Sequence, residues 1–208
     1  KNLRKNRTEA IMPLAMTAIL IFAVLGYGIS RLNNVFTGER LKVAVIQGNI
    51  PQKDKWDPRF ADMIMEKYDS LTKAAAKGGA DLIIWPETSV PGFIETEKDL
   101  SENVSNLALS VNSPILVGAP RYEDTAGSAS YFNSAYLFLK DGAVARRYDK
   151  VHLVPFGEYL PFKNIFSFVE RFSRRPIGDF KSGKEFTVFS FFVSRSTKEK
   201  NIRMISIN

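Results

Sequence analysis

Cysteine is absent from this chain of 208 residues, and histidine occurs only once, at position 152. The lack of cysteine excludes disulfide bonds and metal sites built from thiolates. The single histidine argues against a histidine-rich metal centre and against a Ser-His-Asp triad. The sequence therefore predicts no metal site, and it also lacks internal repeats and low-complexity tracts.

Charged residues are missing from positions 10–30, a run dominated by aliphatic residues, methionine and phenylalanine. About 20 residues of α-helix span the roughly 30 Å hydrocarbon core of a membrane. The apolar part of a signal peptide is shorter and ends in a small-residue cleavage site, which we do not find before Arg31. We therefore predict a transmembrane helix over residues 10–30, with a buried core helix as the alternative.

Basic residues flank this apolar run on both sides. The positive-inside rule then predicts that residues 1–9 form a cytoplasmic flank and that the residues after the apolar run lie outside the inner membrane. Residues 31–40 would be a linker. The net charge of +7 favours an anionic partner such as a membrane surface. Nucleic acid is not predicted as a partner, because the basic residues form no recognition motif. The flanking residues are Lys1, Arg4, Lys5, Arg7, Arg31 and Arg40.

Predicted strands alternate with predicted helices in residues 41–208 and then give way to hairpins. The nearly continuous apolar run at 80–85 indicates a strand that is covered on both faces. This order is typical of an α/β sandwich with a mixed sheet. We expect strands at 41–47, 80–85, 115–119, 134–139, 143–148, 186–193 and 202–207, and helices at 58–77 and 99–112.

Residues 155–183 interrupt this alternation, because their phenylalanines are interleaved with lysine and arginine. An irregular loop that packs its aromatic side chains onto the core explains this composition. A basic, aromatic lid at a lipid interface explains it equally well. The sequence leaves both interpretations open.

Two short motifs, Trp85-Pro86-Glu87-Thr88 and Tyr148-Asp149-Lys150, each follow a predicted strand. Side chains that follow strands gather at the carboxyl edge of an α/β sheet, where active sites form. There Glu87 has the chemistry of a general base and Lys150 that of an oxyanion-stabilising group. Glu158 is a third candidate. Together with a cysteine, such groups perform acyl transfer at a carbonyl; taken singly, each also fits an ordinary solvated side chain.

The order and spacing of several motifs carry more information than any one of them. They are Gln47-Gly48-Asn49-Ile50-Pro51-Gln52, Lys55-Trp56, the two motifs above and His152-Leu153-Val154-Pro155-Phe156-Gly157-Glu158-Tyr159. Together they resemble apolipoprotein N-acyltransferase, the membrane-bound branch of the nitrilase, or carbon-nitrogen hydrolase, superfamily. The glutamate and lysine motifs are shared across the superfamily, whereas the last run and the apolar segment point to this branch.

The resemblance implies a four-layer αββα sandwich with a Glu-Lys-Cys triad, on the periplasmic side of the bacterial inner membrane. In that family a cysteine takes an acyl chain from a phospholipid as a thioester. The N-terminal amine of a diacylglyceryl-cysteine lipoprotein then accepts the chain, and no cofactor is required. Carried over, Glu87 is the general base, Lys150 stabilises the oxyanion and Glu158 is an accessory acid. Trp56 and Asn133 match substrate-binding positions.

The chain departs from the family in two respects. The family has several transmembrane helices before this domain, whereas one is predicted here. In the family the cysteine lies at the end of a late strand. In this chain the matching position is Ser206, Asn208 or a position beyond the last residue. We therefore expect residues 41–208 to form a partial domain, incomplete at the C-terminus, with a lid-like loop at 155–183. Such a fragment would not catalyse the reaction alone.

Two other functions stay open. A nitrilase-type amidase would use the same groups on a small amide, but it needs no membrane anchor, so residues 10–30 count against it. A membrane-tethered pseudoenzyme that binds lipid or lipoprotein would fit the missing cysteine.

Overall fold

The structure is a computed structural model, and it describes residues 2–33, 40–125, 127–161, 180–195 and 198–205. The chain divides into two compact units, Lys1–Arg40 and Leu41–Asn208, and each is described by itself. Most of the expected lid-like loop lies outside the described residues, and so do Ser206 and Asn208.

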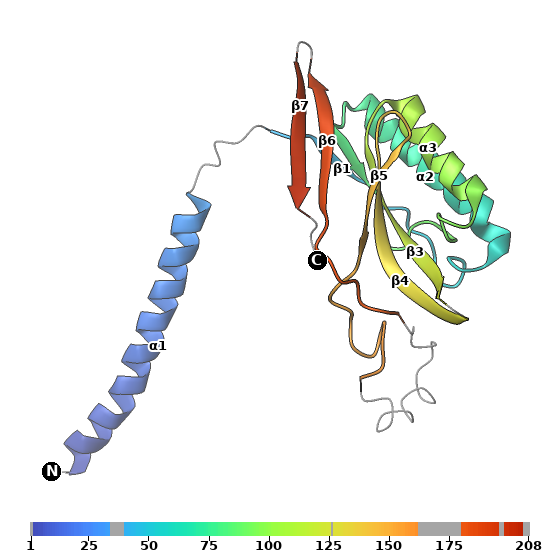
Figure 1. Ribbon diagram of the computed structural model, residues 1–208. Helices are drawn as coiled ribbons and strands as arrows, with labels where there is room; N and C mark the ends of the chain where they lie inside the picture. Colours follow the sequence, from blue (N-terminus) through green and yellow to red (C-terminus); the bar gives the residue numbers. More distant parts are fainter. Residues whose placement is uncertain (1, 34–39, 126, 162–179, 196–197, 206–208) are drawn as a thin grey trace. The chain divides into compact units, whose positions relative to one another are not determined.

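The described residues of the N-terminal unit include the helix α1, which spans Asn2–Leu32 (Figure 1). Within it, Ile11–Leu32 has a mean hydropathy of 2.0, so this stretch is able to cross a membrane by length and composition. Its apolar side chains are exposed rather than packed into a core, and Phe22 is 73% exposed. The helix predicted at 10–30 is thus present. It begins earlier than predicted because residues 2–9 contain no Gly or Pro to stop it.

The second unit is built on a five-stranded sheet with the order β1-β2-β3-β4-β5. Strands β1 (Val43–Val45) and β3 (Ile115–Thr125) run parallel to β2 (Leu82–Ile84). Strand β4 (Ser128–Phe138) is antiparallel to both β3 and β5 (Val144–Asp149). The sheet is therefore mixed, as predicted. Because β2, β3 and β5 run in the same direction, their carboxyl ends lie toward one edge of the sheet.

Two helices, α2 (Ala61–Lys77) and α3 (Lys98–Val111), cover one face of this sheet (Figure 1). A short 3₁₀ helix, η1 (Pro58–Phe60), precedes α2, so the helix predicted at 58–77 begins with a 3₁₀ turn. Its expected cap is present, because the Asp57 carboxylate accepts a hydrogen bond from the Arg59 backbone N–H at 3.0 Å. The core under these helices includes Ile64, Tyr68, Ile83, Trp85, Val104, Val117, Tyr136 and Phe138.

A two-stranded sheet of β6 (Val188–Arg195) and β7 (Lys198–Ile205) packs on the opposite face (Figure 1). Neighbouring residues on a strand point to opposite faces, and β2 shows this directly. Ile83 belongs to the core under the helices, whereas Leu82 packs with Phe189 and other side chains of β6. Helices, large sheet and small sheet are three successive layers of the expected nitrilase-like αββα sandwich.

Strands β3 and β4 form a hairpin that is longer than predicted. Each strand has 11 residues, although strands were expected only at 115–119 and 134–139. The missed part of β3 is polar, and polar residues weaken a strand pattern. Those residues are stabilised by partners instead, as in the ion pair of Arg121 with Glu123 at 2.8 Å.

The other predicted strands are present with shifted ends. β6 covers Val188–Arg195 rather than 186–193, and β7 (Lys198–Ile205) begins before the predicted 202–207, whose last two positions lie outside the described residues. Strand ends depend on pairing partners, which the pattern of one strand does not contain.

Candidate active site

The segment after β2 crosses over β3 and brings Glu87 toward the carboxyl edge of the sheet. The crossing occurs at Gly118, where a Cβ atom would lie 2.7 Å from the Glu87 Cα and would collide with the Pro86 carbonyl oxygen. The backbone N–H and the hydroxyl of Ser89 both donate to the Gly118 carbonyl, at 2.7 and 2.9 Å. The missing side chain of Gly118 therefore permits the close approach that positions Glu87.

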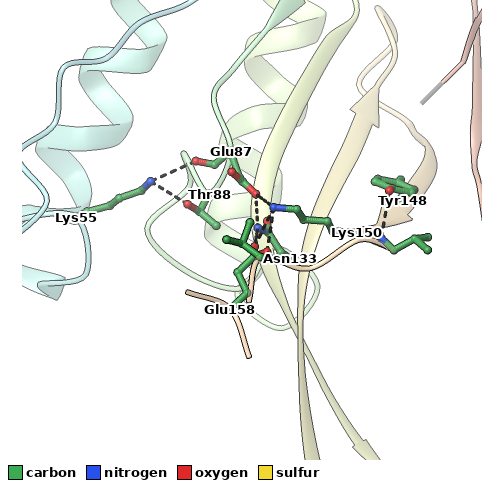
Figure 2. Close-up of polar contacts among 9 residues, drawn as sticks. Lys55, Glu87, Thr88, Asn133, Tyr148, Lys150 and Glu158 are labelled. Carbon is green, nitrogen blue, oxygen red and sulfur yellow. Dashed lines mark hydrogen bonds and ion pairs between the residues drawn. The ribbon is translucent and has the colours of Figure 1, made fainter. Parts of the chain in front are cut away.

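Lys55, from the loop before η1, holds the same turn (Figure 2). Its ammonium donates to the Thr88 hydroxyl at 2.8 Å and to the Glu87 carbonyl at 3.2 Å. Thr88 has a φ of 46°, in the left-handed region that β-branched residues rarely adopt. Burial lowers the pKa of Lys55, and the charge of Glu87 opposes that change. Lys55 is thus a half-buried cation that stabilises a strained turn next to Glu87.

Lys150 follows β5 and points toward two carboxylates (Figure 2). Its Nζ lies 2.9 Å from Glu87 Oε1 and 3.0 Å from Glu158 Oε2. Its backbone is also fixed, because its N–H donates to the Asn133 carbonyl at 2.8 Å and its carbonyl accepts from Gly183 at 2.9 Å. The structure therefore brings together the three side chains predicted as catalytic.

Glu158 lies in a tight turn that orients its carboxylate. Its backbone N–H donates to the Val154 carbonyl at 2.9 Å, while its carboxylate accepts from the Val154 N–H at 2.8 Å. Its carbonyl accepts from the Phe180 N–H at 3.0 Å. Only 14% of the Glu158 side chain is exposed. Glu158 is therefore the more buried of the two acids beside Lys150.

Asn133, on β4, joins the two carboxylates. Its Nδ2 donates to Glu158 Oε1 at 2.6 Å and also to Glu87 Oε1. The residue is buried, with 6% of its surface exposed. Asn133, expected among the substrate-binding residues, thus contacts both acids and holds them around one ammonium.

Lys150 and Glu158 stabilise each other in their charged forms. Burial acts to lower the pKa of Lys150, but hydrogen bonds and charge attraction to Glu87 and Glu158 together outweigh it and raise that pKa. Burial acts to raise the pKa of Glu158, but hydrogen bonds from Val154, Asn133 and Lys150, together with the charge of Lys150, outweigh it and lower that pKa. Both groups are therefore charged at neutral pH.

Glu87 and Trp56 are the most exposed of the predicted site residues. The Glu87 side chain is 59% exposed, and Trp56 is 50% exposed. A carboxylate that is open to solvent and adjoins an ammonium is accessible to a substrate. Trp56 follows Lys55 in the sequence, and its role in substrate binding stays a prediction.

The arrangement combines one ammonium with two carboxylates of unequal exposure. Glu87 can take a proton from an approaching nucleophile, and Lys150 can stabilise a negative oxygen. Glu158 balances the charge of the ammonium and keeps it in place. In the part of the chain that the structure describes, no group of three or more His, Cys, Asp or Glu side chains is placed to hold a metal ion.

Sequence reasoning missed the parts played by Lys55 and by residues 180–183. Lys55 stood in the motif set, but nothing in the sequence indicated its contact with the Glu87 turn. Residues 180–183 supply the backbone N–H groups that bind the carbonyls of Lys150 and Glu158. Gly183 was the available signal, because a side chain there would collide with the backbone at the end of β5.

Comparison with known families matches this chain to the carbon-nitrogen hydrolases. The match covers residues 42–195, which include Lys55, Glu87, Asn133, Lys150 and Glu158. Because the match extends over most of the chain, the chain belongs to the carbon-nitrogen hydrolase family.

Individual relatives point to one branch of that family. The chain is 37% identical over 176 residues to the apolipoprotein N-acyltransferase of Geobacter metallireducens, covering 84% of this chain and 34% of that protein. It is 32% identical over 175 residues to the protein of the same name from Pseudomonas putida, covering 83% of this chain and 34% of that protein. The chain thus spans about a third of the length of these relatives. They confirm the resemblance drawn from the motifs.

Among solved structures, an amidase from Nesterenkonia sp. is similar to this chain. The two are 17% identical, with a TM-score of 0.46, over 79% of this chain and 55% of the amidase.

Proposed function

We propose that this chain carries the base and the oxyanion-stabilising group of an apolipoprotein N-acyltransferase. The observation that carries the proposal is the contact of the Lys150 ammonium with both Glu87 and Glu158. A base beside a fixed cation is what acyl transfer at a carbonyl requires. The two relatives of that name and the apolar helix α1 support this branch over a small-amide hydrolase.

The first half-reaction transfers an acyl chain from a phospholipid to a cysteine. Glu87 takes the thiol proton, and the sulfur attacks the ester carbonyl carbon, whose oxygen becomes negative beside Lys150. The ester C–O bond then breaks, Glu87 returns the proton to the leaving alcohol, and a thioester and a lysophospholipid result. The cysteine is implied by the family resemblance and is not among these 208 residues, so the step is proposed for these groups acting with a cysteine from outside this sequence.

The second half-reaction passes the chain to a lipoprotein. The neutral N-terminal amine of a diacylglyceryl-cysteine attacks the thioester carbonyl, and the oxygen again becomes negative beside Lys150. The C–S bond breaks, Glu87 takes the proton from the nitrogen, and the thiolate recovers that proton. Glu158 keeps Lys150 charged and positioned in both halves.

We further propose that α1 anchors the chain in the bacterial inner membrane with residues 41–208 on the periplasmic side. The support is the basic flank at residues 1–9 together with the positive-inside rule. This placement suits the reaction, because a phospholipid donor and a lipid-bearing acceptor both reside at a membrane.

A chimera tests the proposed function. Residues 42–195 of this chain would replace the matching segment of the Geobacter metallireducens enzyme, and N-acylation of a diacylglyceryl lipoprotein would be measured. We expect activity in the chimera, its loss in the E87Q and K150M variants, and no loss in E102Q, which changes an exposed acid on α3. A folded chimera without activity, or an E87Q variant as active as its parent, would refute the proposal.

The 208-residue chain itself is predicted to form no acyl-enzyme, because it contains no thiol. A serine in the same role has a much higher pKa than a cysteine, and a carboxylate is a weak base for it. The measurement is incubation of the purified chain with labelled phosphatidylethanolamine, followed by a search for covalently bound label, with the Geobacter enzyme as positive control. Covalent labelling of this chain would contradict the prediction, and Ser206 would then be the first residue to replace.

The missing cysteine favours one second candidate, a membrane-tethered lipid or lipoprotein binder without catalysis. The chimera separates the two functions, because only an acyltransferase segment restores transfer of the acyl chain. A binder retains labelled lipid without a covalent bond, and its chimera transfers no acyl chain.

A further inference from the structure

A cavity away from the candidate active site lies between the start of α3 and strands β4 and β5. We call it the α3 cavity; its volume is about 350 Å³, and Lys98, Ser101, Tyr136 and Arg146 are among its lining residues. Asn133 and Tyr136 are three residues apart on β4, so they point to opposite faces of the sheet. The α3 cavity is therefore separate from the site that contains Asn133.

Tyr136 contributes a buried hydroxyl to this cavity. Only 2% of the residue is exposed, and its hydroxyl has no hydrogen-bond partner among the described residues. Native proteins rarely leave a buried polar group unpaired, so such a group calls for an explanation. Burial raises the pKa of Tyr136, and the negative charge of Glu95 raises it further. The hydroxyl therefore keeps its proton and remains a donor. Glu95 and Arg147, whose charges act on the hydroxyl, also line the cavity.

Positive charge without a counter-ion surrounds the same cavity. In the described part of the chain, neither Lys98 nor Arg146 forms an ion pair. Lys98 is also the first residue of α3, whose N-cap residue, Glu97, makes no side-chain hydrogen bond to the helix. The backbone N–H groups at a helix N-terminus attract anions. Unpaired cations, a helix N-terminus and an unpartnered hydroxyl donor thus converge on one cavity.

We propose that the α3 cavity binds a phosphate group, either as free phosphate or as a lipid headgroup. Two unpaired cations suit a phosphate group, which carries up to two negative charges when free and one as the phosphodiester of a lipid headgroup. The hydroxyls of Tyr136 and Ser101 add neutral hydrogen-bond donors. A phosphate has more acceptor oxygens than the two of a carboxylate, so this number of donors favours phosphate as the ligand.

The ion pair between Arg147 and Glu95 regulates access to the hydroxyl in this proposal. Their side chains are 38% and 36% exposed, and exposed ion pairs are weak. An incoming phosphate therefore competes with Glu95 for the Arg147 guanidinium and gains contact with Tyr136.

The test is an NMR titration of the complete 208-residue chain, held in uncharged detergent micelles, with inorganic phosphate. We expect the backbone amide signals of Lys98, Ser101 and Val144 to shift with a common affinity. R146M should weaken binding about tenfold, since it removes a charge-assisted hydrogen bond. The matched control K67M removes an exposed lysine of α2 that does not line the cavity and should leave the affinity unchanged.

Two more variants test the role of the hydroxyl. Y136F should weaken phosphate binding about tenfold without lowering the melting temperature, because the hydroxyl it removes has no protein partner. E95Q should strengthen binding, because it removes the carboxylate that competes for Arg147. Wild-type affinity in Y136F, or equal losses in R146M and K67M, would overturn the proposal.

A second arm identifies the source of the phosphate. The chain would be placed in nanodiscs of phosphatidylcholine alone or with phosphatidylglycerol, and the same amide signals would be compared. Shifts that require phosphatidylglycerol and disappear in R146M assign the site to a lipid headgroup. Saturation by inorganic phosphate alone, unchanged by the lipid, assigns it to a free phosphate. If neither probe shifts these signals, the proposal is wrong.

Discussion

Replacing Lys150 with methionine tests whether this residue organises the candidate active site. The change keeps much of the side-chain volume and removes the ammonium. It leaves the carboxylates of Glu87 and Glu158 beside each other, both still bound by the amide of Asn133. Two like charges at such a distance repel each other, and the remaining cation nearby, Lys55, binds the carbonyl of Glu87 rather than its carboxylate.

The expected loss of stability follows from the exposure of each pair. Lys150 and Glu158 are 21% and 14% exposed, so their hydrogen-bonded ion pair contributes about 1.5–3 kcal/mol. Glu87 is 59% exposed, and solvent screening reduces its pair with Lys150 to about 1 kcal/mol or less. We therefore expect K150M to lower the free energy of unfolding by about 2–4 kcal/mol near neutral pH.

The loss should depend on pH in a definite direction. The raised pKa of Lys150 stabilises the fold fully below the ordinary lysine value of 10.5. The lowered pKa of Glu158 stabilises it above the ordinary value of 4.5, and that part is lost only as the pH falls through the folded pKa. Between about pH 5 and about pH 8 these two groups therefore leave wild-type stability flat. In K150M, acidification lets one carboxylate take a proton, so the deficit should shrink toward about pH 5.

The assay is urea unfolding of the complete chain in uncharged detergent, followed by tryptophan fluorescence. Trp85 is 3% exposed and stacks on Tyr68, so its signal reports on the core. The control K67M should lose little stability at any pH. A K150M deficit that stays constant across this pH range, or that equals the K67M deficit, would refute the reasoning.

Two further predictions concern the turn that carries Glu87. G118A should lose about 1–3 kcal/mol of stability in urea unfolding and displace Glu87, seen as NMR shifts, because the added Cβ collides with the crossing backbone. The control G28A in α1 adds a Cβ to open space and should show neither effect. K55M should increase the hydrogen-exchange rate of the Thr88 amide more than T88V does. K55M removes two hydrogen bonds of the turn, whereas T88V removes only one of them. Equal exchange rates in the two variants would contradict this account.

Much of the fold was predictable from local patterns. The nearly continuous apolar run at 80–85 identified β2, and the Asp-Pro pair at 57–58 located the start of the helical segment before Ala61. The outer half of the β3–β4 hairpin was not predictable. Arg121 and its neighbours look like loop residues, and their strand conformation depends on pairing with β4 and on ion pairs between side chains.

The residues of the candidate site could be proposed from the sequence, but their geometry could not. Motifs indicated Glu87, Lys150 and Glu158, since each follows a strand or lies in a recognisable run. The amide of Asn133 between the two acids was not predictable as a contact, because it depends on the register of β4 and on the crossing at Gly118. The ammonium of Lys55 is another such case, because it reaches the Glu87 turn across 33 positions of sequence.

The long β3–β4 hairpin has a consequence for the order of folding. Its strands are adjacent in sequence, so they pair by local contacts, which form faster than contacts between distant segments. Asn133 is therefore placed early, whereas Glu87 reaches Lys150 only after a contact across 63 positions has closed. Pulsed hydrogen exchange during refolding should find the amides in the middle of β4 protected before that of Ser89, whose N–H binds the Gly118 carbonyl across 29 positions next to Glu87, and the opposite order would disprove this sequence of events. The catalytic candidates would then assemble around an amide that is already in position, and the reactive charges would meet last.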